Sequence, residues 1–111
     1  MKLEIRPAEQ GSDAGSHTHR TTLLAYGDGL PVGQLILEPA LNAPAEGVIR
    51  LIDVDPALRG GGIGSALVSA AEAQARQAGW QVLSAIPPAA TAHFWEANGF
   101  AASALGWHKS L

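Results

Sequence analysis

The alternation of apolar and polar residues predicts strands in the first part of the chain. Leu3 and Ile5 alternate with charged residues up to Pro7, as in a short half-buried strand that stops at a proline. Two further apolar segments, 20–26 and 32–38, lie on either side of a Gly-Asp-Gly turn. Glycine and aspartate tolerate the backbone angles of tight turns, so we expect these segments to form a hairpin.

Longer apolar segments follow in the second half. Residues 47–54 are β-branched and aliphatic, which predicts a strand covered on both faces. Apolar residues recur at helical spacing between Ile63 and Gln77, before a stop at Gly79, and predict a helix. The apolar run 80–86 predicts another strand.

The remaining segments complete the expected domain. Residues 91–98 predict a short helix that Gly99 ends, and a last strand is expected within 100–111. Residues 9–19 are rich in Gly, Ser, Asp and His without apolar periodicity, so they predict a mobile loop. Because no repeat, linker or low-complexity segment is found, residues 1–111 are expected to form a single α/β domain.

Composition and charge narrow the functional classes. Of the 111 residues, 47% are hydrophobic and 15% are charged, as in a globular domain with a packed core. A formal net charge of -3 offers no basic surface, so neither nucleic acid nor membrane is expected as a partner. The absence of cysteine excludes disulfides, thiolate metal sites and cysteine nucleophiles. The first residues contain no signal-like or membrane-spanning apolar run, which favours a cytoplasmic location.

A glycine-rich turn carries the most informative chemistry. The segment from Arg59 to Gly64 leads from a predicted strand directly into a predicted helix. Helix N-termini expose unpaired N–H groups at the positive end of the helix dipole, and glycines let a phosphate approach the backbone. Gly64 is followed by Ser65 and Ala66, without the lysine of a nucleotide P-loop, and the spacing fits the dinucleotide fingerprint poorly. The turn therefore predicts a phosphate or pyrophosphate site.

Two linked motifs resemble those of the GNAT superfamily of N-acetyltransferases. Arg59, Gly62 and Gly64 occupy the fixed positions of the family's Arg/Gln-x-x-Gly-x-Gly/Ala motif, after a strand that ends in Val-Asp-Pro. Residues 94–100 are similar to the family's second signature, in which aromatic and acidic residues precede Gly-Phe. The resemblance implies a central mixed, mostly antiparallel sheet with two main helices. It also implies acetyl-CoA as cosubstrate and transfer of the acetyl group to an amine by direct attack.

By this resemblance, the coenzyme lies along the end of a strand and the start of a helix. Backbone N–H groups from Gly60 to Ser65 would hold the pyrophosphate, and the strand end from Ile52 to Val54 would pair with the pantetheine arm. The thioester would lie between that strand and the one ending near Ile86. The residues expected to bind the coenzyme are Ile52, Val54, Arg59, Gly60, Gly61, Gly62, Ile63, Gly64, Ser65, His93 and Trp95.

Trp95 occupies the position at which many family members carry the tyrosine that protonates the departing thiolate. Indole does not release its proton at accessible pH, so Trp95 is expected to pack against pantetheine or in the core. A coenzyme A thiolate is a fair leaving group without such help. His93, in the same helix, either contacts the coenzyme or is a surface residue.

An amine acceptor is mostly protonated near neutral pH, so its attack is helped by a base. Asp53 is the first candidate because it ends the strand beside the expected thioester; the alternative is a solvated strand or turn residue. Glu46 and Glu38 are weaker candidates. His17 and His19 lie in the predicted loop, where a histidine pair can act as a base but is no metal site by itself. No metal is predicted.

The sequence leaves the acceptor and the class of function open. Family members usually place two helices in the region of residues 9–19, and their absence predicts an open groove for a small-molecule or protein amine. The missing tyrosine and helices favour the alternative of a non-catalytic acyl-CoA-binding module that regulates a protein partner. A module for another phosphorylated ligand is a third interpretation. A homodimer is expected, because an apolar sheet edge and Trp107 have little left to cover them.

Overall fold

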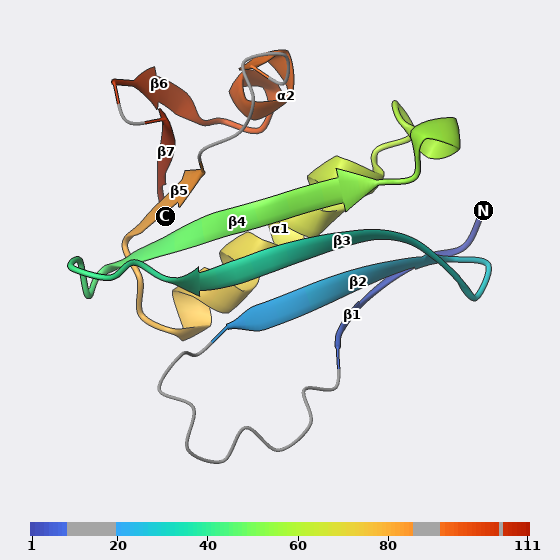
Figure 1. Cartoon of the computed structure of the whole chain (residues 1–111), viewed down its shortest axis with the longest axis horizontal. Helices are drawn as coiled ribbons and strands as arrows, with labels where there is room; N and C mark the ends of the chain where they lie inside the picture. Colours follow the sequence, from blue (N-terminus) through green and yellow to red (C-terminus); the bar gives the residue numbers. More distant parts are fainter. Residues whose placement is uncertain (9–19, 86–91, 105) are drawn as a thin grey trace.

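A seven-stranded sheet and two α-helices make up the part of the chain that the structure describes (Figure 1). The structure is a computed structural model that describes residues 1–8, 20–85, 92–104 and 106–111. The strands are β1 (Leu3–Pro7), β2 (Thr21–Gly27), β3 (Leu30–Pro39), β4 (Glu46–Val54), β5 (Val82–Ala85), β6 (Ala101–Ser103) and β7 (Gly106–Ser110). The helices are α1 (Ile63–Gln77) and α2 (Ala92–Ala97), and a 3-10 helix, η1 (Pro56–Leu58), precedes α1.

The strands lie in the order β1-β2-β3-β4-β5-β7-β6. Neighbouring strands are antiparallel except for β4 and β5, which are parallel. Parallel neighbours need a crossover connection, and α1 supplies it between β4 and β5. The expected α/β class, with a mixed and mostly antiparallel sheet, is confirmed.

The β2–β3 hairpin forms where the alternating pattern predicted it. Gly27 pairs with Leu30, and the residues between them, Asp28 (φ 50) and Gly29 (φ 85), are in the left-handed region. Two such residues form the tight turn whose twist matches that of the flanking strands. The turn residues therefore fix the register next to the turn, and a shift between Ala25 and Tyr26 changes it farther along the hairpin.

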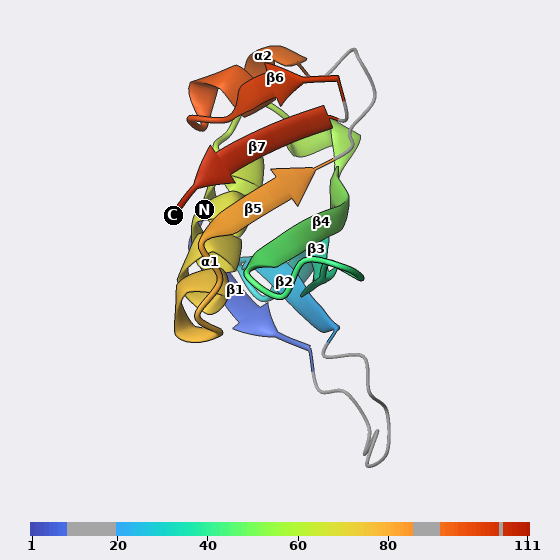
Figure 2. The ribbon, with the colours of Figure 1, turned by 90° about the vertical axis from the view of Figure 1, so that its left-hand side faces the viewer.

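Helix α1 packs on one face of the sheet and forms the core with it (Figure 2). Its buried side chains recur at helical spacing, so that one side of the helix faces β1 to β4. Across the interface lie buried leucines and an isoleucine of the strands. The main residues of this core are Leu23, Leu35, Leu37, Ile49, Ile63, Leu67, Val68, Ala71 and Ala75.

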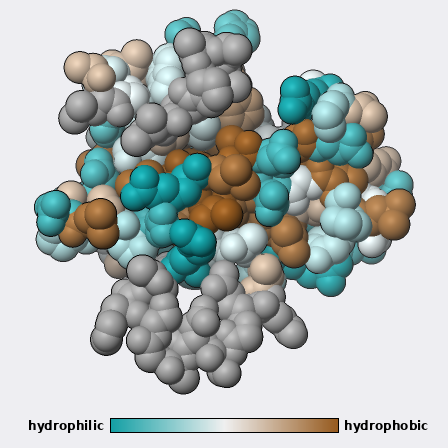
Figure 3. Space-filling view, in the orientation of Figure 1, coloured by the Kyte–Doolittle hydropathy of each residue, from teal (hydrophilic) through white to brown (hydrophobic). Residues whose placement is uncertain are grey.

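The opposite face of the sheet carries no helix in the described part of the chain, and a bulge in β4 shapes it. Ile36 pairs with Leu51 and Leu37 pairs with Ile49, so Arg50 is an extra residue in β4. Ile49 is buried, whereas Arg50 and Leu51 are exposed. The prediction that 47–54 is covered on both faces is therefore wrong for the second half of the strand. Hydrophobic surface is visible along the middle of this face (Figure 3).

The end of the chain differs in detail from the prediction. The expected single last strand is two, β6 and β7, and the strand expected at 80–86 is described only from Val82 to Ala85. Trp107 lies in β7, between β5 and β6, and therefore not at a sheet edge. Self-association stays a prediction, but Trp107 no longer supports it. The expected loop 9–19 lies outside the described residues. Neither described helix has the length and apolar character needed to cross a membrane.

Candidate functional site

The two parallel strands of the sheet pair over only part of β4. Pairing between β4 and β5 extends from Glu46 to Ile49, while β4 continues to Val54. On its other side β4 remains paired with β3 as far as Val54. No described strand pairs with Ile52 to Val54 on the β5 side, so these backbone groups can accept or donate hydrogen bonds to another molecule.

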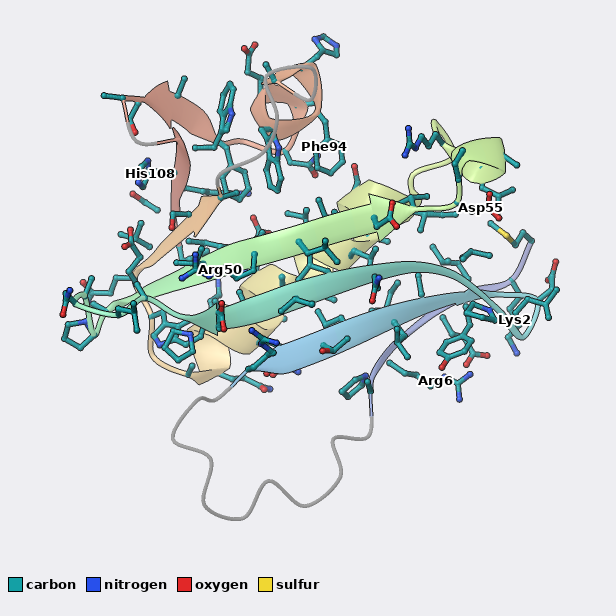
Figure 4. All side chains as sticks on the ribbon, in the orientation of Figure 1. Lys2, Arg6, Arg50, Asp55, Phe94 and His108 are labelled. Atoms are coloured by element: carbon teal, nitrogen blue, oxygen red, sulfur yellow. The ribbon has the colours of Figure 1, made fainter. Side chains whose placement is uncertain are left out.

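A cleft of about 690 Å³ opens at this point. The end of β4 forms its base, the turn between η1 and α1 forms one wall, and α2 forms the other. Phe94 projects from α2 toward the start of α1 (Figure 4). The lining residues are Ile52, Asp53, Val54, Leu58, Arg59, Gly60, Gly62, Ile63, Gly64, Ser65, His93, Phe94 and Ala97.

The N-terminus of α1 presents unpaired N–H groups to this cleft. Gly62 is the N-cap residue (φ 85) and makes no side-chain cap, and the first intrahelical bond runs from the Ala66 N–H to the Gly62 carbonyl. The N–H groups of Ile63, Gly64 and Ser65 precede that bond and have no acceptor within the helix. No acidic side chain lies in the first turn, so the positive end of the helix dipole is not neutralised locally.

The four glycines of the turn differ in their backbone angles and in their contacts. Gly60 (φ 88) and Gly62 have left-handed backbone angles, and a Cβ at either position would meet nothing within 4 Å. Gly61 is not among the residues that line the cleft, and its N–H donates to the Leu58 carbonyl at 3.3 Å. A Cβ on Gly64 would lie 2.9 Å from Phe94 Cε1. Glycine at position 64 therefore allows α2 to approach α1, a role that the motif alone did not reveal.

Arg59 and Asp53 are the ionic side chains on the lining of the cleft. Arg59 is exposed and follows η1 directly, and within the described residues it forms no ion pair. Its guanidinium is free to contact a phosphate at the helix N-terminus. His93 is exposed on α2 and lines the opposite wall.

The aromatic residue of the α2 wall is Phe94. Trp95 is 1% exposed and contacts Phe94 and Phe100 edge to face, with ring centroids 5.1 and 4.9 Å apart. It belongs to the core, and it is not among the residues that line the cleft. Phe94, Leu58 and Ala97 also line the cleft and were not expected from the sequence. In a helix as short as α2, apolar spacing does not show which of two adjacent aromatic residues faces inward.

Asp53 adjoins two hollows. Besides the cleft, it lines a second hollow of about 330 Å³. Leu24, Gln34 and Asp53 pair across β2, β3 and β4, which places them on the face opposite α1. The second hollow is lined by Leu24, Pro31, Val32, Gly33, Gln34, Asp53 and Asp55. A molecule on this face and another in the cleft would both reach Asp53.

The other candidate bases are engaged or distant. Glu38 is paired with Arg50 at 2.5 Å and with Arg20 at 3.4 Å, and Glu46 lies at the opposite end of β4 from Asp53. His17 and His19 lie outside the described residues. Among the residues placed by the structure, no cluster of histidine and acidic side chains could hold a metal ion.

Comparison with known proteins decides the family. The model of the acetyltransferase (GNAT) domain matches residues 18–102. The chain belongs to the GNAT family of acetyltransferases. No curated protein matches this GNAT domain.

Solved structures share the fold. A protein from Desulfovibrio desulfuricans assigned to the GNAT family is 24% identical, with a TM-score of 0.71 over 82% of this chain and 66% of its own. Nourseothricin acetyltransferase is 29% identical, with a TM-score of 0.67 over 74% of this chain. This GNAT domain spans only 50% of nourseothricin acetyltransferase. A GNAT family acetyltransferase from Elizabethkingia anophelis, solved with acetyl-CoA bound, is 16% identical, with a TM-score of 0.76 over 91% of this chain and 77% of its own.

Proposed function

We propose that this GNAT domain is an N-acyltransferase that moves the acetyl group of acetyl-CoA to an amine by direct attack. The observation that carries the proposal is the cleft itself, in which the unpaired N–H groups of α1 lie beside the unpaired strand end of β4. A similar fold from Elizabethkingia anophelis holds acetyl-CoA. Family membership supports acyl transfer in general, and the amine acceptor is our inference.

The residues present fit the two ends of an acyl-CoA. The N–H groups of Ile63, Gly64 and Ser65 would bind the pyrophosphate, with Arg59 adding a positive charge. The free backbone of Ile52 to Val54 would pair with the amide groups of the pantetheine arm. Phe94 and Ala97 would give this arm an apolar wall on the side of α2.

The acceptor would reach the thioester from the face opposite α1. The hollow that adjoins Asp53 on that face offers a route to the end of β4 that the coenzyme cleft does not occupy. Asp53 and Asp55 give this hollow negative charge, which favours a protonated amine. Holding both substrates at Asp53 would replace a bimolecular encounter by an oriented attack.

Asp53 would then serve as the base. The bound ammonium first gives a proton to the Asp53 carboxylate, directly or through water, and the neutral nitrogen then attacks the carbonyl carbon of the thioester. The carbon–sulfur bond breaks and the sulfur leaves as a thiolate. The second proton that the nitrogen loses as the amide forms passes to water. With Trp95 in the core, the described site offers no tyrosine to protonate the thiolate, which leaves without that help.

Thioester consumption against a panel of amines tests this function. We expect release of free thiol with at least one amine, and a fall in kcat of about 10²- to 10⁴-fold in Asp53→Asn with coenzyme affinity retained. Asp28→Asn, in the β2–β3 turn, is the matched control and should keep the parent's rate.

Two results would redirect the proposal. Unchanged turnover in Asp53→Asn would remove Asp53 as the base. Tight binding of acetyl-CoA without turnover of any amine would favour the non-catalytic regulatory module, which the buried Trp95 in place of an acidic tyrosine also supports.

A further inference from the structure

Helix α2 forms a whole wall of the cleft although it is only six residues long. A helix of this length has no stability of its own, because nucleation costs more than its few hydrogen bonds return. Its position must therefore come from contacts with the rest of the fold. Trp95 supplies the apolar contact, and Phe94 rests on the bare backbone of Gly64 at the start of α1.

The C-terminal end of α2 has a polar contact as well. The Gly99 and Phe100 N–H groups donate to the carbonyls of Glu96 and Trp95, the pattern that ends many helices. The Asn98 carbonyl is left over, and Lys109 Nζ donates to it at 2.9 Å. A lysine at this end of a helix also interacts favourably with the helix dipole.

The same ammonium group reaches α1. Lys109 Nζ lies 2.5 Å from Glu72 Oε1, and these two side chains are 26% and 10% exposed. Glu72 Oε1 is buried and receives no well-aligned hydrogen bond from the described residues, so the charge of Lys109 is what compensates it. Lys109 is thus fixed between a buried carboxylate of α1 and a carbonyl at the end of α2.

The local backbone accommodates this lysine. Gly99 has a φ of 88, and a Cβ there would lie 3.2 Å from both Cε and Nζ of Lys109. The ammonium group also lies 5.9 Å from the centre of the Phe100 ring. Glycine at the helix end therefore serves both the turn and the close approach of the lysine.

We propose that Glu72 and Lys109 are positioning residues that hold α2 at a fixed distance from α1 and so set the width of the coenzyme cleft. Neither residue lines the cleft, and the bridge acts through His93, Phe94 and Ala97 on the far wall. This inference rests on the proposed binding of acetyl-CoA. It predicts that loss of the bridge weakens coenzyme binding more than it slows the chemical step at Asp53.

Two variants separate positioning from general stability. Lys109→Met leaves Glu72 buried without compensation, which destabilises the fold. The double variant Glu72→Leu with Lys109→Met replaces both charges by apolar groups, and such replacements are often neutral for stability. The double variant should unfold at a temperature near the parent's while the Asn98 carbonyl still lacks its donor.

We expect both variants to raise the Kd and KM for acetyl-CoA by about tenfold, equivalent to about 1.4 kcal/mol, with kcat within about twofold of the parent. Lys109→Arg keeps a donor and a charge at this point and should retain near-parent affinity. Lys2→Met removes an exposed ion pair with Glu4 and is the matched control, with no change in affinity expected. Calorimetry and initial-rate kinetics supply these values.

Amide exchange gives a readout that does not depend on the coenzyme. In the double variant, the amides of residues 93–100 should exchange faster relative to those of α1 than in the parent. Parent-like affinity in the double variant would overturn the positioning role. If the parent bound no acetyl-CoA, the proposed function would fall. Amide exchange tests the bridge separately: unchanged exchange in α2 of the double variant would show that the bridge does not hold this helix.

Discussion

The part of the sheet from β1 to β4 and the part from β5 to β7 are stabilised in different ways. The first has paired strands of five to ten residues and a core shared with α1 from Ile63 to Ala75. The second consists of strands of three to five residues and the short helix α2. The pairing of β5 with β4 and the buried residues of β5 connect it to the rest at one end, and Trp95 and the Glu72–Lys109 pair do so at α2. The cleft lies where the two parts separate, so it has one firmly built wall and one wall set by a few contacts.

The largest effect is expected at Trp95, the main apolar anchor of the second part. Trp95→Ala should lower the free energy of unfolding by about 3–5 kcal/mol and release the α2 wall. Leu37→Ala, in the core of the first part, should cost about 2–5 kcal/mol while the folded fraction keeps its coenzyme affinity. Urea unfolding and calorimetry on the two variants measure both quantities. If folded Trp95→Ala bound acetyl-CoA as tightly as folded Leu37→Ala, the two walls would not differ as proposed.

A smaller effect is expected where the two walls touch. Gly64→Ala places a methyl group against Phe94, so α2 must shift, and acetyl-CoA affinity should fall by about tenfold. Adding Phe94→Leu should recover part of the loss because it makes room. Ser69→Ala, on the exposed side of α1, is the matched control for helix propensity. If Gly64→Ala bound the coenzyme like the parent, Phe94 would not be a fixed wall.

The smallest effect separates two residues of the same strand. Ile49 and Leu51 would share a face in a regular strand, but the bulge at Arg50 leaves Ile49 buried and Leu51 41% exposed. Ile49→Ala should cost about 2–5 kcal/mol of unfolding free energy, and Leu51→Ala at most about 0.5 kcal/mol. Similar losses in the two variants would mean that the bulge is absent in solution.

The same contrast explains what the sequence could and could not predict. Helix α1 is found from Ile63 to Gln77 as expected, since it has a long apolar period and a glycine stop. The bulge at Arg50 has no sequence signal, because a run of apolar residues is compatible with several registers. Residues 101–103 (Ala-Ala-Ser) are all exposed and do not alternate between apolar and polar, so β6 was not expected as a separate strand. Short elements depend on tertiary contacts that local patterns do not contain.

The candidate site follows the same division. The glycine turn was predicted because backbone chemistry at a helix N-terminus depends on local sequence, whereas the strand end was expected only from the resemblance to the GNAT family. The α2 wall was not predicted in detail. Which of Phe94 and Trp95 faces the cleft is decided by the packing of Trp95 against Phe100, and the Lys109 contact joins residues far apart in the chain.

Calorimetry with acetyl-CoA on variants of the glycine turn tests whether the N-terminus of α1 binds the coenzyme. Gly62→Asp places a negative charge at the N-cap of α1, and aspartate tolerates the left-handed backbone better than most residues, so the variant should fold. Loss of two charge-assisted hydrogen bonds, at about 1.5–3 kcal/mol each, predicts binding weaker by about a hundredfold or more. Gly62→Asn, with the same shape and no charge, should lie between Gly62→Asp and the parent.

Arg59→Ala should also lose less than Gly62→Asp, because an exposed side chain adds to backbone contacts that remain. We therefore expect Gly62→Asp to be the weakest binder, Arg59→Ala to be intermediate and the parent to be the strongest. Binding of acetyl-CoA by folded Gly62→Asp as tightly as by the parent would contradict the assignment of the coenzyme site, and with it the proposed function.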